Sequence, residues 1–162
     1  MTGYHPLRNA IFSTTVVTAA AVAGSSATDP ESAWYKGIKK PDWQPPSEAF
    51  PIVWTALYAG AAITSTKVLN HHQREGDDDE ARGYRRALIA NMALNAGWSY
   101  LFFQRKQPAE ATAGAAALAL STARLARRAR RAGRGKGLSL APYAGWTAFA
   151  AVLSADIWRR NS

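Results

Sequence analysis

Apolar stretches separated by charged connections divide this chain. There are five, each of about the 20 residues that a helix needs to cross a bilayer: 7–27, 50–69, 84–103, 109–126 and 138–158. No run of about ten residues alternates between polar and apolar positions, as a membrane-spanning strand would. Because lipid offers the backbone no hydrogen-bond partners, only helices or closed barrels can span it. The sequence therefore predicts an all-α membrane protein, a bundle of five transmembrane helices forming a single domain over residues 1–162.

The charge balance is strongly basic, and it favours a membrane over a nucleic-acid partner. Lys and Arg number 20 against 11 Asp and Glu, a net charge of +9, and they bracket the apolar stretches. The densest basic run, 124–137, has no interleaved aromatic side chains on which bases could stack. We interpret it as a flexible cytoplasmic flank and expect no nucleic-acid partner. The mean hydropathy of −0.23 is low for a membrane protein and supports the alternative, a soluble helical domain.

The first apolar stretch allows two interpretations. In the first interpretation, residues 7–27 form a transmembrane helix that the mature protein keeps, because the stretch is long enough to cross the bilayer. In the alternative, Arg8 belongs to the basic region of a secretory signal peptide, and Ala21-Val22-Ala23 is its cleavage site.

Metal and thiol chemistry have little support in the sequence. The chain has no cysteine, so it has neither a disulfide framework nor a thiolate ligand. His71 and His72 are adjacent, so their side chains point apart, and no third ligand follows at the spacing of a metal site. We expect no metal site and no catalytic residues.

Aromatic residues and prolines are concentrated between positions 34 and 58. Trp34-Tyr35 precedes Lys40-Pro41-x-Trp43-x-Pro45-Pro46 and then Phe50-Pro51-x-Val53-Trp54-Thr55-x-Leu57-Tyr58. The first three prolines exclude a helix around them, because proline lacks an N–H and clashes with the preceding turn. Pro51 instead suits the first turn of a helix. We expect a stiff loop, 28–49, that leads into a helix carrying Trp54 and Tyr58 on one face.

This stretch resembles the tryptophan-rich sensory protein or translocator protein family, also known as the peripheral-type benzodiazepine receptors. Two later motifs agree: Leu94-Asn95-x-x-Trp98-Ser99-x-Leu101-Phe102-Phe103, and Pro142-Tyr143-x-x-Trp146-x-x-Phe149-Ala150-x-x-Leu153. The resemblance covers the chain from Trp34 to Asn161. It implies five transmembrane helices, with the 28–49 loop lying over a ligand pocket.

The resemblance also implies a function. Members of the family bind tetrapyrroles such as protoporphyrin, and other flat hydrophobic ligands such as sterols, as sensors, regulators or carriers. Porphyrin would then be a ligand and not a required cofactor, and the other partners would be the lipid bilayer and a second copy in a homodimer. The alternative is an enzyme that breaks down porphyrin in light. No catalytic triad or thiol supports that chemistry here, so we favour binding without catalysis.

Carried over by position, the resemblance assigns these residues to the pocket: Trp43, Trp54, Asn95, Trp98, Trp146, Ala150 and Leu153. Tryptophan offers flat apolar walls, asparagine offers oriented hydrogen bonds, and alanine leaves room, as in many small-molecule sites. Two structural alternatives stay open. Trp98 and Trp146 could serve only to pack helices, and Asn91 and Asn95, on one helical face, could join helices.

Four positions depart from the pattern of the family. The family usually has Met-Gly at Ala61-Ala62, an acidic residue near Gly114, and Asn at Ser154. The sterol-recognition pattern at the end of the last helix is not met either, because Trp158 stands where a tyrosine is needed. These departures affect close helix packing at Ala61-Ala62 and the polar groups available at Gly114 and Ser154.

The distribution of Lys and Arg predicts the orientation of the bundle. With five spans, the amino terminus, the 70–86 connection and the 124–137 run share one side, and most of the basic residues lie there. We therefore expect a cytoplasmic amino terminus and an external carboxyl terminus. A phosphatase reporter that works only outside the cytoplasm should be active when fused to the carboxyl terminus. Activity there of a reporter restricted to the cytoplasm would contradict this orientation.

Overall fold

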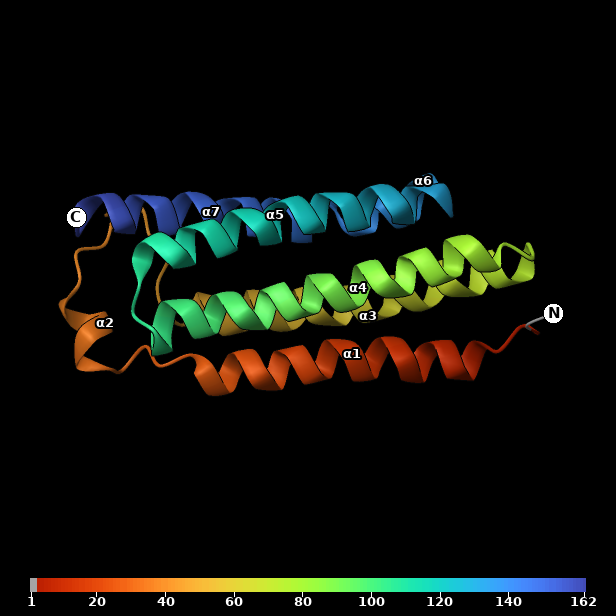
Figure 1. Ribbon diagram of the computed structural model, residues 1–162, viewed down its shortest axis with the longest axis horizontal. Helices are drawn as coiled ribbons and strands as arrows, with labels where there is room; N and C mark the ends of the chain where they lie inside the picture. Colours follow the sequence, from red (N-terminus) through yellow and green to blue (C-terminus); the bar gives the residue numbers. More distant parts are fainter. Residues whose placement is uncertain (1–2) are drawn as a thin grey trace.

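The computed structural model describes residues 3–162, and every regular element in that range is helical (Figure 1). The five long helices lie side by side and alternate in direction: α1 (Pro6–Ala27), α3 (Ala49–Arg74), α4 (Asp78–Ser99), α5 (Pro108–Arg131) and α7 (Ala141–Arg160). Two short helices, α2 (Ala33–Gly37) and α6 (Arg134–Ser139), lie in the connections. The all-α fold expected from the sequence is confirmed.

The side chains are arranged as in a bundle that sits in lipid. Large apolar residues point outward: Leu7 is 72% exposed, Ile52 71% and Leu120 74%. Asn91 and Asn95, in contrast, are completely buried. Water would favour the opposite arrangement, whereas in lipid apolar side chains face the acyl chains and polar or small residues join the helices. This pattern argues against the soluble helical domain.

Three segments are long and apolar enough, by length and composition, to cross a membrane. They are Pro6–Ala27, Ala49–Arg74 and Arg134–Arg160. Helices α4 and α5 are equally long but more charged, because α4 has acidic residues in its first turn and α5 has arginines in its last turn. The five long helices of the expected bundle are therefore present, although two of them are only partly apolar.

The acidic connection expected before 84 is instead the beginning of α4. Asp77 caps the helix, and its side chain accepts a hydrogen bond of 3.1 Å from the Glu80 N–H. Asp78 and Asp79 follow in the first turn, where the helix dipole favours negative charge. Helix α3 likewise runs on to Arg74 and does not end at 69. These capping signals are in the sequence, but the apolar stretches alone do not show them.

The basic run is also more ordered than expected. Helix α5 continues through Arg131 and does not end at 126, and α6 follows before α7 begins at Ala141. Arg131 Nη1 lies 2.7 Å from a carboxylate oxygen of Glu80, and Arg128 Nη1 lies 3.7 Å from the other. Basic side chains also suit the end of a helix, where the dipole favours positive charge.

A polar cluster around Asn9 joins α1 to α3 and α4. Asn9 is completely buried. Its Nδ2 donates to Asn70 Oδ1 and to Gln73 Oε1, each at 2.8 Å, and its Oδ1 accepts from Arg85 Nη2 at 2.9 Å. One turn later on the same face, the buried hydroxyl of Ser13 has no hydrogen-bond partner among the described residues. Asn9 thus forms three hydrogen bonds between helices, whereas the Ser13 hydroxyl forms none with the described residues.

Asn9→Leu should lower the free energy of unfolding by about 1–3 kcal/mol, because it leaves two amides and a guanidinium without their partner. Ser13→Ala is the matched control. It removes a buried hydroxyl that has no hydrogen-bond partner among residues 3–162, so the change should stay within about 0.5 kcal/mol. Thermal unfolding in detergent, followed by helical circular dichroism, measures both variants. Equal losses in the two would show that the hydrogen bonds of Asn9 contribute no stability.

Candidate functional site

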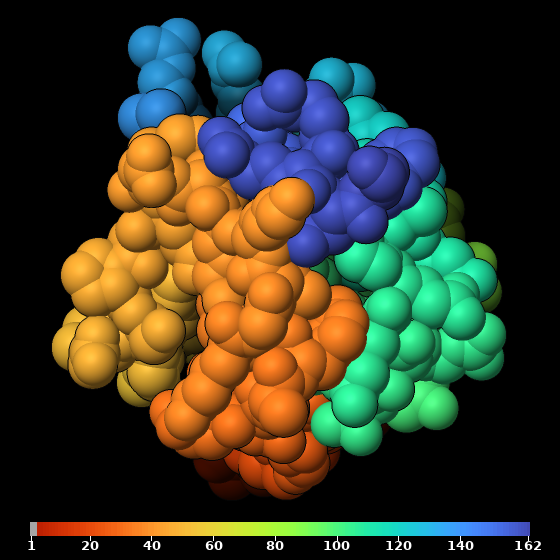
Figure 2. Space-filling view, turned by 90° about the vertical axis from the view of Figure 1, so that its left-hand side faces the viewer, coloured from red at the N-terminus to blue at the C-terminus, as the bar shows by residue number. Residues whose placement is uncertain are grey.

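A cavity of ≈ 330 Å³ lies at one end of the bundle, beneath the connecting segment 28–48. Four helices contribute to its walls, namely α1, α3, α4 and α7. Figure 2 looks onto this end and shows the segment, in orange, lying across the end of the bundle. The cavity therefore lies between the helices and beneath the chain that joins α1 to α3, and it is partly open, because lining residues such as Ser25 and Thr55 are exposed.

Trp54 is the centre of the aromatic wall. Its ring stacks on Tyr58, with centroids 5.5 Å apart and planes at 27°, and lies 6.1 Å from the ring of Trp98. The indole Nε1 of Trp98 donates to Ser154 Oγ at 3.3 Å. This bond from α7 fixes the orientation of the Trp98 ring, so α3 and α4 present flat aromatic surfaces to the cavity.

The end of α4 gives the cavity two more aromatic rings. After Ser99 the chain continues as a π-helical turn, Tyr100–Gln104. Such turns are rare in proteins, and those that occur are often at functional sites. Phe102 and Phe103 both line the cavity from this turn, with ring centroids 4.9 Å apart. They pack against Tyr35 of the connecting segment, at 6.1 and 5.3 Å between centroids. The rings thus link the walls to the covering segment.

Helix α1 contributes a glycine where the other helices bring hydroxyl groups. A Cβ atom on Gly24 would lie 3.5 Å from Ser99 Oγ and 4.0 Å from Tyr58 Oη. All three residues line the cavity. The missing side chain therefore leaves the two hydroxyls of α4 and α3 accessible at the inner part of the cavity.

No Asp, Glu, Lys, Arg or His of residues 3–162 lines this cavity. Its polar side-chain groups are hydroxyls, one amide and the indole N–H groups of Trp54 and Trp98. Gln44 Nε2 donates to Tyr35 Oη at 3.0 Å. Burial raises the pKa of Tyr35, an effect that the hydrogen bond with Gln44 partly opposes, so this phenol is neutral near pH 7. The site suits an uncharged, mostly apolar molecule.

The connecting segment is held by hydrogen bonds among its own residues and by hydrogen bonds to Asn161 near the carboxyl terminus. The Ser32 side chain caps α2 by accepting a 3.2 Å bond from Tyr35 N–H. The Lys40 ammonium donates to the Tyr35 carbonyl and lies 4.4 Å from the centre of the Tyr35 ring. Burial lowers the pKa of Lys40.

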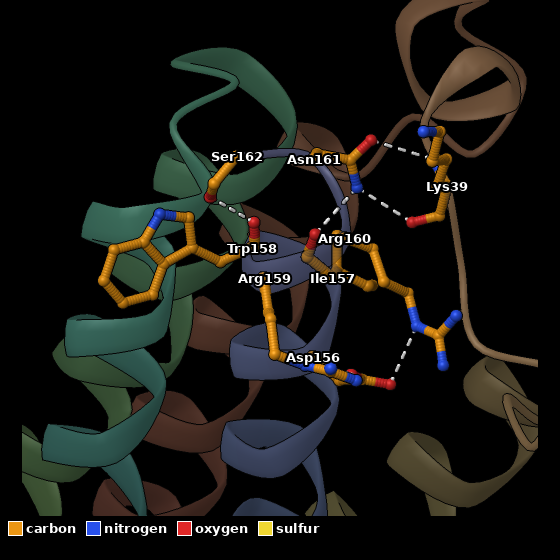
Figure 3. Close-up of polar contacts among 8 residues, drawn as sticks. All are labelled: Lys39, Asp156, Ile157, Trp158, Arg159, Arg160, Asn161 and Ser162. Atoms are coloured by element: carbon orange, nitrogen blue, oxygen red, sulfur yellow. Dashed lines mark hydrogen bonds and ion pairs between the residues drawn. The ribbon is translucent and has the colours of Figure 1, made fainter.

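Asn161 ties the segment to the end of α7, as Figure 3 shows. Lys39 N–H donates to Asn161 Oδ1 at 2.9 Å, and Asn161 Nδ2 donates to the Lys39 carbonyl at 2.8 Å. The same Nδ2 also donates to the Ile157 carbonyl at 2.7 Å, which anchors the amide on its helix. One asparagine thus pairs with the backbone of the cover as a neighbouring strand would.

The structure brings three of the seven expected pocket residues to the cavity: Trp54, Trp98 and Leu153. Trp146 lies behind Trp54, with ring centroids 6.3 Å apart. It packs against Phe50 and Phe149, and its Nε1 is buried without a hydrogen-bond partner in the described chain. It supports the wall from outside.

The remaining three expected residues lie away from the cavity lining. Trp43 is 46% exposed and meets the ring of Phe149 edge-on at 5.8 Å. Ala150 is buried in α7. Asn95 is completely buried and hydrogen-bonds to Tyr58 Oη and Tyr143 Oη, so it joins α3 and α7 to α4.

Several cavity residues were not among those expected, notably Gly24, Tyr58, Ser99, Phe102 and Phe103. A signal existed for some of them. Tyr58 and Phe102 follow Trp54 and Trp98 by four positions, and thus share their helix faces. Gly24 carries no comparable signal, because only the packing of α1 against α3 and α4 places it at the cavity.

These features define a class: a helical membrane protein with an uncharged, aromatic cavity covered by a tryptophan- and proline-rich segment. The model of the TspO/MBR family matches residues 12–159, so the chain belongs to this family.

Known proteins with similar sequences include the membrane protein YtaB of Bacillus subtilis, 31% identical over 79% of this chain and 80% of its own length. The translocator protein of Sus scrofa is 33% identical over 79% of this chain and 75% of its own length. The tryptophan-rich sensory protein of Cereibacter sphaeroides is 29% identical over 94% and 92% of the two chains. The family and the membrane location inferred from the sequence are therefore confirmed.

Asn161→Ala should loosen the cover of the cavity. It removes both bonds to the Lys39 backbone, and we expect amide exchange of the peptide containing Lys39 to become about tenfold faster. Ser162→Ala is the matched control, because that hydroxyl bonds to the Trp158 carbonyl of α7 and not to the segment. Hydrogen–deuterium exchange with mass spectrometry measures both. Unchanged exchange in Asn161→Ala would mean that other contacts hold the segment.

Proposed function

We propose that this protein binds flat hydrophobic ligands of the tetrapyrrole class, and also of the sterol class, in the cavity beneath the connecting segment 28–48. The observation that carries the proposal is the cavity itself. Its volume of ≈ 330 Å³ falls within the range of small-molecule sites. Planar rings from α3, α4 and the connecting segment line it, and among residues 3–162 no charged side chain does.

The chemistry of the walls favours such ligands. Aromatic side chains interact best with other planar rings through stacked or edge-on contacts. Trp54 and Trp98 offer these contacts from two helices, and Phe102 offers them near the cover. The carboxylates of a porphyrin would be costly to bury in an uncharged cavity, so they would remain at the mouth, while the macrocycle enters.

The physiological role that we propose is that of a sensor or carrier. Relatives of this chain are named tryptophan-rich sensory protein and translocator protein. Binding without chemistry is sufficient for either role. Opening of the covering segment, which the Tyr35 ring contacts and the Asn161–Lys39 hydrogen bonds hold in place, would admit and release a ligand in either role.

Titration of the purified protein with protoporphyrin tests the proposal. Binding should quench tryptophan fluorescence, since Trp54 and Trp98 line the cavity. In Trp54→Ala the affinity should fall by about threefold to more than tenfold, because stacking contributes about 0.5–1.5 kcal/mol beyond area burial.

Trp158→Ala is the control, because that side chain is 46% exposed at the end of α7 and does not line the cavity. Its affinity for protoporphyrin should match that of the parent. Helical circular dichroism confirms the fold of each variant. If Trp54→Ala stays folded and binds like the parent, the cavity is not the porphyrin site.

A further inference from the structure

A chain of hydrogen bonds runs from the cavity wall into the core of the bundle. Tyr58 Oη bonds to Asn95 Oδ1 at 2.9 Å, and Asn95 Nδ2 bonds to Tyr143 Oη at 3.1 Å. Tyr143 Oη bonds to Asn91 Oδ1 at 2.7 Å, and Asn91 Nδ2 bonds to Thr122 Oγ1 at 2.9 Å. We call this series the Tyr58–Thr122 chain. It connects α3, α4, α7 and α5.

The inner end of this chain fixes the position of its protons. Thr122 Oγ1 lies 2.8 Å from the Leu118 carbonyl, which can only accept. The hydroxyl proton of Thr122 is used there, so its oxygen accepts from Asn91 Nδ2, which also donates to Ser121 Oγ at 3.2 Å. An amide nitrogen only donates, so Asn91 Nδ2 faces Thr122 and Asn91 Oδ1 faces Tyr143.

The same logic extends to the cavity. Tyr143 donates its one proton to Asn91, so its oxygen accepts from Asn95 Nδ2. Asn95 Oδ1 is then left to accept from Tyr58. Turning the Asn95 amide around would place its oxygen against Tyr143, which has no proton left to give. A buried acceptor would remain unpaired, at a substantial energetic cost in a water-free interior.

Tyr58 therefore faces the cavity as an acceptor only. Its proton points away toward Asn95, while its oxygen lies beside Gly24 and Ser99, which line the cavity. The hydroxyls of Ser99 and Ser154 can rotate to donate or to accept, so they discriminate less between ligands.

A second acceptor lies near the cover. Gln44 lines the cavity, and its Nε2 is bonded to Tyr35 Oη. Its Oε1 is buried without a partner in the part of the chain that the structure describes. Gln44 precedes α3, whereas Tyr58 lies well inside it, about 13 Å along the axis from the helix start. Because Gln44 Oε1 is fully buried, it lies out of reach of a ligand, and Tyr58 Oη is the acceptor whose direction is set at the cavity wall.

We propose that the cavity selects a flat ligand whose buried part is uncharged and carries a hydroxyl or N–H group, which donates to Tyr58 Oη. A ketone or ether of the same shape has only acceptor oxygens. Its oxygen would then face Tyr58 Oη with no proton between them. This inference rests on the proposed function, because it specifies the chemistry of the ligand that the same cavity takes. Tyr58 sets the specificity, and Asn95 and Tyr143 hold its proton in place.

Hydroxypyrene and methoxypyrene provide a matched pair of probes. Both are flat and uncharged and share one ring system, but only hydroxypyrene can donate a hydrogen bond. Titration of the full chain in detergent, followed by tryptophan quenching, gives the two affinities. The parent should bind hydroxypyrene about threefold to tenfold more tightly, the ratio expected for one hydrogen bond.

Two variants test the source of this preference. Tyr58→Phe removes the acceptor, so the two probes should bind with nearly equal affinity. Tyr143→Phe removes the acceptor of Asn95 Nδ2, so the Asn95 amide can turn and release the proton of Tyr58. The preference should fall there as well. A residue with only a structural role would change both affinities together and leave their ratio unaltered.

Tyr84→Phe is the control for both variants. It removes a buried tyrosine hydroxyl that bonds only to Ser65, at 2.9 Å, and does not line the cavity. Its preference for hydroxypyrene should equal that of the parent. Should Tyr58→Phe fail to fold, the comparison of the two probes in the parent decides the question.

The possible failures can be told apart. Equal affinity for the two probes in the parent, or a preference that survives in Tyr58→Phe, would overturn the assignment of Tyr58 and leave the cavity as a ligand site. If neither probe nor protoporphyrin binds to the folded parent, the proposed function is wrong, and this inference fails with it.

Discussion

The hydrogen bonds of Asn95 determine how the helices meet around the cavity. Inside a bilayer no water is available to pair a buried amide, so its partners must come from neighbouring helices. Asn95 finds them in Tyr58 of α3 and Tyr143 of α7. The three helices are thereby held at one register, which places Trp54 and Trp98 at a ring distance of 6.1 Å. The aromatic wall depends on a polar contact that lies behind it.

The cavity and its cover are stabilised in different ways. The walls are held by ring packing and by buried hydrogen bonds. The cover is held by ring contacts of Trp34 and Tyr35 with Phe102 and Phe103 and by exposed hydrogen bonds, of which the pair between Asn161 and the Lys39 backbone joins it to the distant end of the chain. Exposed hydrogen bonds open more readily than buried ones. A rigid receptacle under a more readily opened cover is suited to the exchange of a ligand.

The departures from the family pattern are explained by local packing. Ser154 replaces the usual asparagine, yet its oxygen accepts the Nε1 proton of Trp98 at 3.3 Å, so the ring keeps its partner. Ala61 is 1% exposed and still small enough for close contact between helices. At Gly114, a Cβ atom would lie 3.2 Å from Leu101 Cδ1, so a larger residue there requires the Leu101 side chain to shift.

The sequence by itself determined the helical fold, the membrane location and the family, because apolar length and fixed motif spacing are local properties of the chain. It also placed Trp54 and Trp98 at the cavity. It left open whether Asn95 and Trp146 line the cavity or only join and pack helices, and it did not reveal that Gly24 would line the cavity. Those outcomes depend on how the helices rotate and meet, which only the tertiary contacts decide. The direction of the hydrogen bonds in the Tyr58–Thr122 chain also depends on the tertiary contacts, because each donor finds its acceptor on another helix.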